Sequence, residues 1–95
     1  MPKGYVIARA EVTDPEKWAQ YVAKSKVAID KYGGKPIARG GRCEAVEGNA
    51  RPRNVIIEFA SYEDARNYAF SEEYAAARRL REGAGTIDLV VVEGV

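Results

Sequence analysis

The segment NVIIEFAS, residues 54–61, does more than any other stretch to decide the fold of this 95-residue chain. Alternate residues from Val55 to Phe59 share one face of an extended strand, and the density of branched side chains is typical of a central strand. Ser61 is a favourable helix N-cap, with Asp64 at the third helical position. The segment therefore predicts a buried strand that leads directly into a helix.

The N-terminal part predicts a second strand and a longer helix. Residues 5–12 alternate between an apolar and a mixed face, as a half-buried strand does. The next helix has two possible starts, Asp14 as N-cap before Pro15, or Thr13 as N-cap in a capping box with Glu16. One stripe of this helix carries the residues expected to face the core: Trp18, Tyr21, Val22, Ser25, Ala28, Ile29 and Tyr32.

The remaining segments complete a βαββαβ order in one domain, residues 1–95. A strand is expected from Pro36 to about Glu47, with turn residues 48–53 after it, and a last strand over residues 86–92. Ser71 restarts or kinks the second helix. This order is typical of the ferredoxin-like α+β fold, in which two helices pack on one face of a four-stranded antiparallel sheet.

Such a sheet leaves its second face uncovered. The alternation places these residues on that face: Tyr5, Ile7, Arg9, Ile56, Glu58, Val90 and Val92. An exposed apolar patch of this size is typical of an interaction site, and a chain this short buries a limited core. The sequence therefore predicts a homodimer.

Composition narrows the possible functions. The net charge of +1 argues against a nucleic-acid domain, which depends on a basic surface. The chain has no histidine, and Cys43 is its single cysteine, so histidine-based catalysis and the usual zinc, iron and haem sites are not expected. With no histidine and one cysteine, we expect no bound metal or cofactor. No signal peptide or long apolar run is present, which predicts a cytoplasmic protein.

The Arg39-Gly40-Gly41-Arg42 motif has a structural and a functional interpretation. A phosphate-binding glycine loop opens a helix, whereas the expected strand continues here, so phosphate binding is not favoured. Glycines within a strand more often mark a β-bulge or a close approach of backbone or ligand. We expect a bulge.

Other proteins with the βαββαβ order provide alternatives. RNA-recognition domains stack bases on aromatic residues of the third and first strands. The third strand of this chain has Val55, Ile56 and Ile57 there and only Phe59 as an aromatic, and the first strand offers Tyr5 alone. RNA binding is therefore a distant third possibility. Heavy-metal-binding domains of this fold need paired cysteines, and this chain has only Cys43, so that function is not expected. A regulatory amino-acid-binding module remains open.

Five residues are candidates for a ligand site. Arg39 is the candidate anchor for an anionic or carbonyl oxygen, and Trp18, Tyr21 and Arg9 are further binding candidates. Glu58 is the candidate catalytic acid or base, because an apolar site would raise the pKa of its carboxyl group. The structural alternatives are a cross-strand or intersubunit ion pair of Arg9 with Glu58, and aromatic side chains that belong to the core.

Several motifs resemble a known bacterial family over nearly the whole chain. They are ARGG at 38–41, VEG at 46–48, NVIIEFAS at 54–61, SEEY at 71–74 and VVEG at 91–94. These motifs are similar, in the same order, to the domain of unknown function 1330 family within the dimeric α+β barrel superfamily. The chain departs from that family at Ala60 and Glu72, where proline is usual, and at Tyr68-Ala69, where a Trp-Tyr pair is usual.

The resemblance implies a homodimer in which two sheets meet face to face. The superfamily includes cofactor-independent monooxygenases, small isomerases and haem enzymes, so membership implies no single reaction. If the usual aromatic pair lines a pocket, the resemblance implies that the pocket of this chain is larger or differently shaped. The leading hypothesis is a dimer that binds a small organic molecule and could be a cofactor-independent enzyme. The alternative is a non-catalytic binding or regulatory module.

Overall fold

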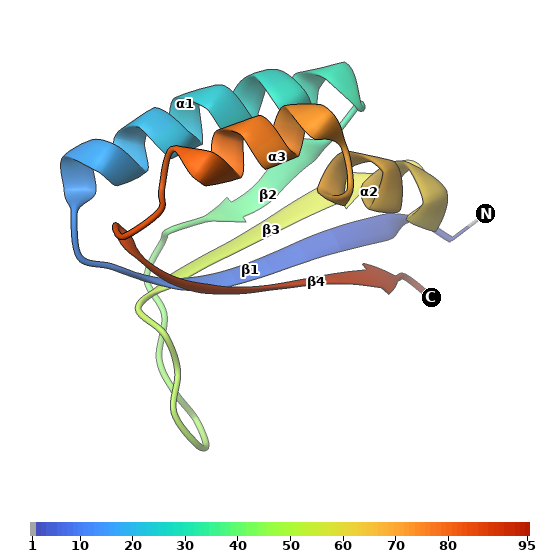
Figure 1. The fold of residues 1–95 in the computed structure, drawn as a ribbon. Helices are drawn as coiled ribbons and strands as arrows, with labels where there is room; N and C mark the ends of the chain where they lie inside the picture. The colour runs from blue at the N-terminus through green and yellow to red at the C-terminus, as the bar shows by residue number, and fades with distance from the viewer. Residues whose placement is uncertain (1) are drawn as a thin grey trace.

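The computed structural model, which describes residues 2–95, has one helical layer on one face of a four-stranded sheet (Figure 1). The elements in chain order are β1 Gly4–Val12, α1 Pro15–Lys31, β2 Lys35–Arg39, β3 Arg53–Phe59, α2 Tyr62–Ala69, α3 Glu72–Arg79 and β4 Gly85–Glu93. The strand order is β2-β3-β1-β4, and every pair is antiparallel. The ferredoxin-like fold is therefore confirmed.

The register of the strands fixes which side chains share a face. Ile7 of β1 lies opposite Ile56 of β3 on one side and Val90 of β4 on the other. These three residues form an apolar stripe on the face that the helices leave uncovered, with Val90 still 53% exposed. The expected uncovered face is confirmed, and β3 and β1 are the two central strands.

Side-chain caps set the helix boundaries. Asp14 caps α1 and accepts a hydrogen bond from the Lys17 amide at 3.2 Å, which decides between the two possible starts. Ser61 caps α2 as expected, accepting from the Asp64 amide at 3.1 Å. Ser71 divides the C-terminal helical segment into α2 and α3. Each hydroxyl or carboxylate satisfies an amide that the first helical turn leaves free.

The second strand is shorter than expected. β2 ends at Arg39, and residues 40–52 form an arm that extends below the sheet, away from the helices (Figure 1). The irregularity in the β2–β3 ladder falls at Ile37 rather than at the Gly-Gly pair, so the expected bulge at that pair was misplaced. Gly40 has φ of +68°, a conformation that favours glycine and turns the chain out of the sheet.

The core lies between the sheet and the helices. Its largest fully buried side chains are Val6, Phe59 and Tyr68, and the Phe59 and Tyr68 rings lie 5.4 Å apart. α1 lies against α3 and stands away from the strands. A second group of aromatic side chains, with Tyr21 and Tyr74 at its centre, joins these two helices. The separation of α1 from the sheet leaves room for the cavity described below.

An ion pair beside this aromatic group should make the stability of the fold depend on pH. Glu73 of α3 pairs with Lys31 and accepts from the Tyr32 hydroxyl at 3.0 Å. The hydrogen bond from Lys31 is the main reason that the pKa of Glu73 falls to about 2. A depressed carboxyl pKa stabilises the fold above the unfolded-state value, and that contribution is lost as the pH falls towards 2. The melting-temperature difference between wild type and Glu73→Gln should therefore be full at pH 6 and shrink between pH 4.5 and 2. A constant difference would contradict this assignment.

Candidate functional site

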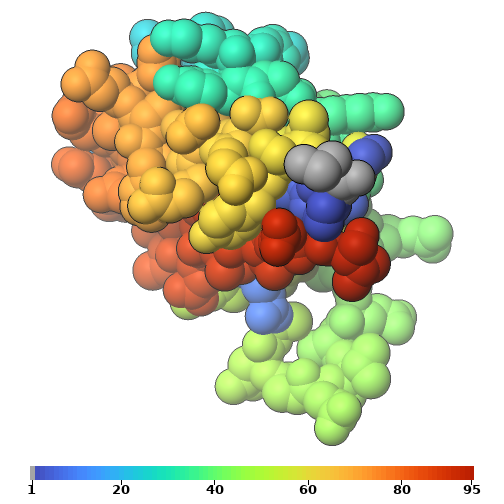
Figure 2. Space-filling model, turned by 90° about the vertical axis from the view of Figure 1, so that its right-hand side faces the viewer, coloured from blue at the N-terminus to red at the C-terminus, as the bar shows by residue number. Residues whose placement is uncertain are grey.

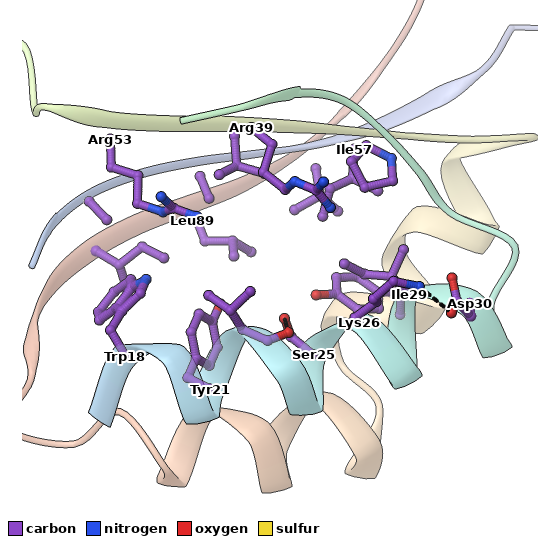
Figure 3. Close-up of a pocket in the computed structure, with 18 residues that line it drawn as sticks. Trp18, Tyr21, Ser25, Lys26, Ile29, Asp30, Arg39, Arg53, Ile57 and Leu89 are labelled. Atoms are coloured by element: carbon purple, nitrogen blue, oxygen red, sulfur yellow. Dashed lines mark hydrogen bonds and ion pairs between the residues drawn. The ribbon is translucent and has the colours of Figure 1, made fainter. Parts of the chain in front are cut away.

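A partly enclosed cavity of about 130 Å³ lies between α1 and the helix-facing side of the sheet (Figure 3). Its sheet side is formed mainly by small or branched side chains, among them Ala8, Ala10, Val55 and Leu89. Ala8 lies opposite both Val55 and Leu89 in the strand register. Because alanines occupy the middle of β1, no side chain from the sheet fills the space beneath α1.

Aromatic residues of α1 form the opposite wall. Trp18 and Tyr21 are 5% and 7% exposed, and their rings meet edge to face with centroids 5.2 Å apart. The Tyr21 hydroxyl is 2.9 Å from that of Tyr74 on α3. Burial is the main reason that the pKa of Tyr21 is raised well above its ordinary value, with Tyr74 adding to it. The phenol therefore stays neutral and serves as a hydrogen-bonding wall rather than a base.

The indole of Trp18 presents an unused donor. Its Nε1 atom is buried and has no hydrogen-bond partner within residues 2–95. Figure 3 shows this nitrogen on the side of the ring that faces the cavity. A buried N–H without a partner costs about 1–3 kcal/mol, so a bound acceptor at this position would recover that free energy.

Two arginines enter the cavity from the sheet side. The side chains of Arg39 and Arg53 reach into the space opposite α1 (Figure 3). Within the described part of the chain, neither forms an ion pair with a carboxylate. A Cβ atom at Gly40 would lie 2.8 Å from Nη1 of Arg53, so glycine at this position leaves room for that guanidinium group. The ARGG motif thus ends β2, and its Gly40 leaves space for the guanidinium group of Arg53.

An ion pair borders the cavity where α1 approaches its C-terminal end. Lys26 Nζ lies 3.0 Å from the Asp30 carboxylate, and both side chains are largely exposed. Asp30 is the only acidic residue among the described residues that line the cavity, and its carboxylate is already paired with Lys26. The fixed polar groups of the cavity are therefore mainly donors and cations, set among apolar walls.

The structure brings three of the five candidate site residues together. Arg39, Trp18 and Tyr21 line the same cavity, whereas Arg9 and Glu58 lie on the uncovered face of the sheet. Glu58 is opposite Tyr5, four positions along β1 from Arg9, so the expected cross-strand pair of Arg9 with Glu58 is wrong.

The local environment of Glu58 also differs from the expectation. Its carboxylate accepts from Lys3 Nζ at 3.1 Å and from the Tyr5 hydroxyl at 3.3 Å. The hydrogen bond from Lys3 is the main reason that the pKa of Glu58 is lowered, and this overturns the expected rise. The strand alternation showed that Glu58 faces away from the helices, but the reach of Lys3 was not evident from the pattern.

Sequence reasoning from the residues missed Arg53 as a cavity residue. The third strand was expected to begin at Asn54, which left Arg53 in the preceding turn. β3 begins at Arg53, which lies opposite Ala10 and shares the helix-facing side with Val55 and Ile57. Extending the alternation of β3 by one residue would have placed Arg53 beside Arg39.

Residues 2–95 contain neither a cluster of metal ligands nor a membrane-spanning helix. No group of three or more His, Cys, Asp or Glu side chains in this range is arranged to hold a metal ion. None of the helices in the same range has the length and apolar character needed to cross a membrane.

The sheet, its helical layer and the cavity define a ferredoxin-like α+β domain with a small-molecule-sized space. The chain belongs to the family described as Domain of unknown function (DUF1330), whose model matches residues 3–95. No curated protein matches the sequence. The family assignment confirms the resemblance found in the motifs.

Solved structures share the fold at low sequence identity. A protein of unknown function from Rhodopseudomonas palustris is 16% identical, with a TM-score of 0.76 over 99% of this chain and 83% of that one. SnoaB, a cofactor-independent oxygenase from Streptomyces nogalater, is 12% identical, with a TM-score of 0.66 over 97% and 92%. A dimeric ferredoxin-like protein of unknown function from Bacteroides fragilis is 17% identical, with a TM-score of 0.55 over 96% and 95%. At these identities the likeness shows the fold alone.

Proposed function

We propose that the protein binds a small organic acid in the cavity between α1 and the sheet. One observation carries this proposal: within residues 2–95, Arg39, Arg53 and the Trp18 N–H all present unpaired donors to a cavity with mainly apolar walls. Ligand sites in proteins commonly combine apolar walls with a few placed polar groups. Guanidinium groups bind carboxylates in a planar, two-pronged geometry, which favours an anionic ligand.

The size of the cavity limits the ligand. The volume of about 130 Å³ is close to that of an apolar cavity that holds benzene in another protein, about 150 Å³. The chemistry and the size together favour a compact aromatic or enolisable carboxylic acid. Its apolar body would pack on Trp18 and Leu89, and its charged group would lie near Arg39 and Arg53.

The protein is proposed to act as a homodimer. Two uncovered sheet faces placed against each other would bury the stripe of Ile7, Ile56 and Val90 in both copies. Structures of similar fold from Bacteroides fragilis and Thermobifida fusca are described as dimeric, which supports this arrangement. The same contact places Arg9 and Glu58 at the interface rather than in the ligand site.

A second candidate function is a cofactor-independent enzyme acting on the same bound acid. The similarity to SnoaB and to two antibiotic biosynthesis monooxygenases described as putative favours it. Two guanidinium groups beside an acidic substrate stabilise its anion and so lower its pKa. The alternative, a non-catalytic binding module, is favoured by the absence of an unpaired carboxylate among the residues that line the cavity.

A thermal-shift experiment tests the binding proposal. Benzoate, salicylate and small β-keto acids at about 100 times Kd should stabilise the fold by about 2.7 kcal/mol, which raises the melting temperature by about 11–22 °C. Arg39→Met should abolish the shift because it removes the charge but keeps much of the side-chain length. The matched control is Arg79→Met, since Arg79 is exposed and lines neither the cavity nor the open pocket between α2, α3 and β4.

Two results would contradict the proposal. One is the absence of a shift with any of the acids, and the other is an equal shift in wild type and Arg39→Met. Mass spectrometry of each stabilising acid after aerobic incubation separates the two candidate functions. Conversion that is lost in Arg39→Met indicates an enzyme, whereas recovery of unchanged acid indicates a binding module.

A further inference from the structure

A groove separate from the ligand cavity lies between α2, α3 and β4. It has a volume of about 520 Å³ and is open to solvent. Apolar residues of β4, including Leu89 and Val91, form its floor, and three arginines border it: Arg66, Arg78 and Arg81. We call this region the basic groove.

The arginines of the basic groove lack ion-pair partners in the part of the chain that the structure describes, and part of the groove's apolar surface is exposed to solvent. Within residues 2–95, none of its three arginines forms an ion pair, and Arg81 Nε is buried without a hydrogen-bond partner. The Arg66 guanidinium lies 4.9 Å from the centre of the Phe70 ring, and Phe70 is 74% exposed. A protein surface with this combination suits a partner that brings carboxylates and an apolar side chain.

The arm formed by residues 40–52 has the complementary chemistry. Its tip, residues 43–50, carries Glu44 and Glu47 and no basic residue. Val46 at the tip is 92% exposed. At its base, Arg51 holds the arm to β4 through the Asp88 carboxylate at 3.0 Å and the Thr86 hydroxyl at 2.6 Å. The arm stands clear of the rest of the molecule (Figure 2).

We propose that the arm of one subunit seats in the basic groove of a second copy, with Glu44 and Glu47 beside the arginines and Val46 on the apolar floor. This inference rests on the proposed homodimer. Half of the arm, about six extended residues, reaches roughly 20 Å. Facing sheets lie about 10 Å apart, and the groove lies one further layer away, so the tip can reach the partner's helical layer.

Seating of the arm would also affect the ligand site of the partner. The Arg81 guanidinium lies 5.0 Å from the centre of the Tyr21 ring and 5.8 Å from that of Trp18. Arg81 therefore borders the basic groove while it packs on the aromatic wall of the cavity. A carboxylate that fixes Arg81 would hold this wall in place.

Cross-linking through Cys43 tests the seating of the arm. Cys43 is exposed on the arm and is the single cysteine of the chain, so a thiol introduced by Phe70→Cys should pair with it rapidly only across the proposed contact. With oxidised glutathione and micromolar protein, a docked pair at an effective concentration of about millimolar should form the disulfide roughly 1,000-fold faster than a collisional pair. The matched control is Val27→Cys, because Val27 is 65% exposed on α1 and away from the groove.

Charge exchange provides a second test, made in the Phe70→Cys background. Glu44→Lys with Glu47→Lys should slow cross-linking, and so should Arg66→Glu with Arg78→Glu. Combining the four substitutions should restore the rate, because the charges are again opposite. Rescue of this kind would not follow if the substitutions acted only on the stability of each subunit.

Light scattering on the same samples separates this inference from the proposed dimer. A dimer in which positions 43 and 70 cross-link no faster than positions 43 and 27 overturns the arm contact and leaves the dimer standing. A monomeric mass for the reduced wild-type protein overturns the dimer itself. Rapid cross-linking at position 70, with rescue by charge exchange, is the result that the arm contact predicts.

Discussion

Replacement of Ile56 by aspartate is expected to convert the protein from dimers to monomers. Ile56 is the β3 member of the apolar stripe, next to Ile7, on the uncovered face of the sheet. In the proposed dimer the new carboxylate would be buried without a partner, and each dimer would contain two of them. An unpaired buried charge costs several kcal/mol, so the dimer dissociation constant should rise by at least about 1,000-fold, equivalent to about 4 kcal/mol.

Light scattering over a dilution series measures this effect, and far-UV circular dichroism verifies that the subunit remains folded. Val27→Asp is the matched control, because Val27 is exposed on α1 and does not belong to the uncovered face. It should leave the mass unchanged. An Ile56→Asp variant that remains dimeric at low micromolar concentration would show that the uncovered face is not the interface.

Replacement of Ala8 by leucine is expected to weaken ligand binding strongly while the fold becomes no less stable. Ala8 lies on the sheet side of the cavity, and a larger side chain there would occupy the space that we assign to the ligand. Substitutions that fill an existing cavity commonly add about 0.5–2 kcal/mol of stability. The affinity for the acid should nevertheless fall by more than about 30-fold, equivalent to about 2 kcal/mol.

Denaturant unfolding and calorimetric titration measure the two effects separately. Ala23→Leu, at an exposed position of α1, is the matched control and should change neither quantity strongly. If Ala8→Leu binds the acid as tightly as wild type, the ligand lies elsewhere. If the variant is strongly destabilised without ligand, the space beneath α1 is too small to accept the added atoms.

The sequence allowed the fold to be predicted because each element carries a local signal. β1 and β3 alternate clearly, and Ser61 and Ser71 are strong caps directly before helical segments. The signal was weakest after Arg39, where the apolar character of Cys43, Ala45 and Val46 resembled a strand. Those residues have no neighbouring strand in the structure, so their backbone groups face solvent and the arm forms instead.

The candidate site could be predicted only in part. The stripe of α1 identified Trp18 and Tyr21, and the end of β2 identified Arg39. Glu58 was selected for its apolar neighbours in sequence, but its face of the sheet carries it away from the cavity. The cavity itself depends on the distance between α1 and the strands, which is set by the packing of α1 against α3. No local pattern reports such a distance.

Binding of an organic acid beneath α1 is tested most directly by the indole N–H resonance of Trp18. Trp18 is the only tryptophan of the chain, so its indole N–H gives a single, unambiguous signal in a ¹⁵N–¹H correlation spectrum. Titration with benzoate or another acid that stabilises the fold should shift this signal saturably, as expected when a bound acceptor reaches the donor. The same titration of Arg39→Met should leave the signal in place. A wild-type indole signal that stays constant while backbone signals elsewhere move to saturation would contradict the assignment of the ligand site.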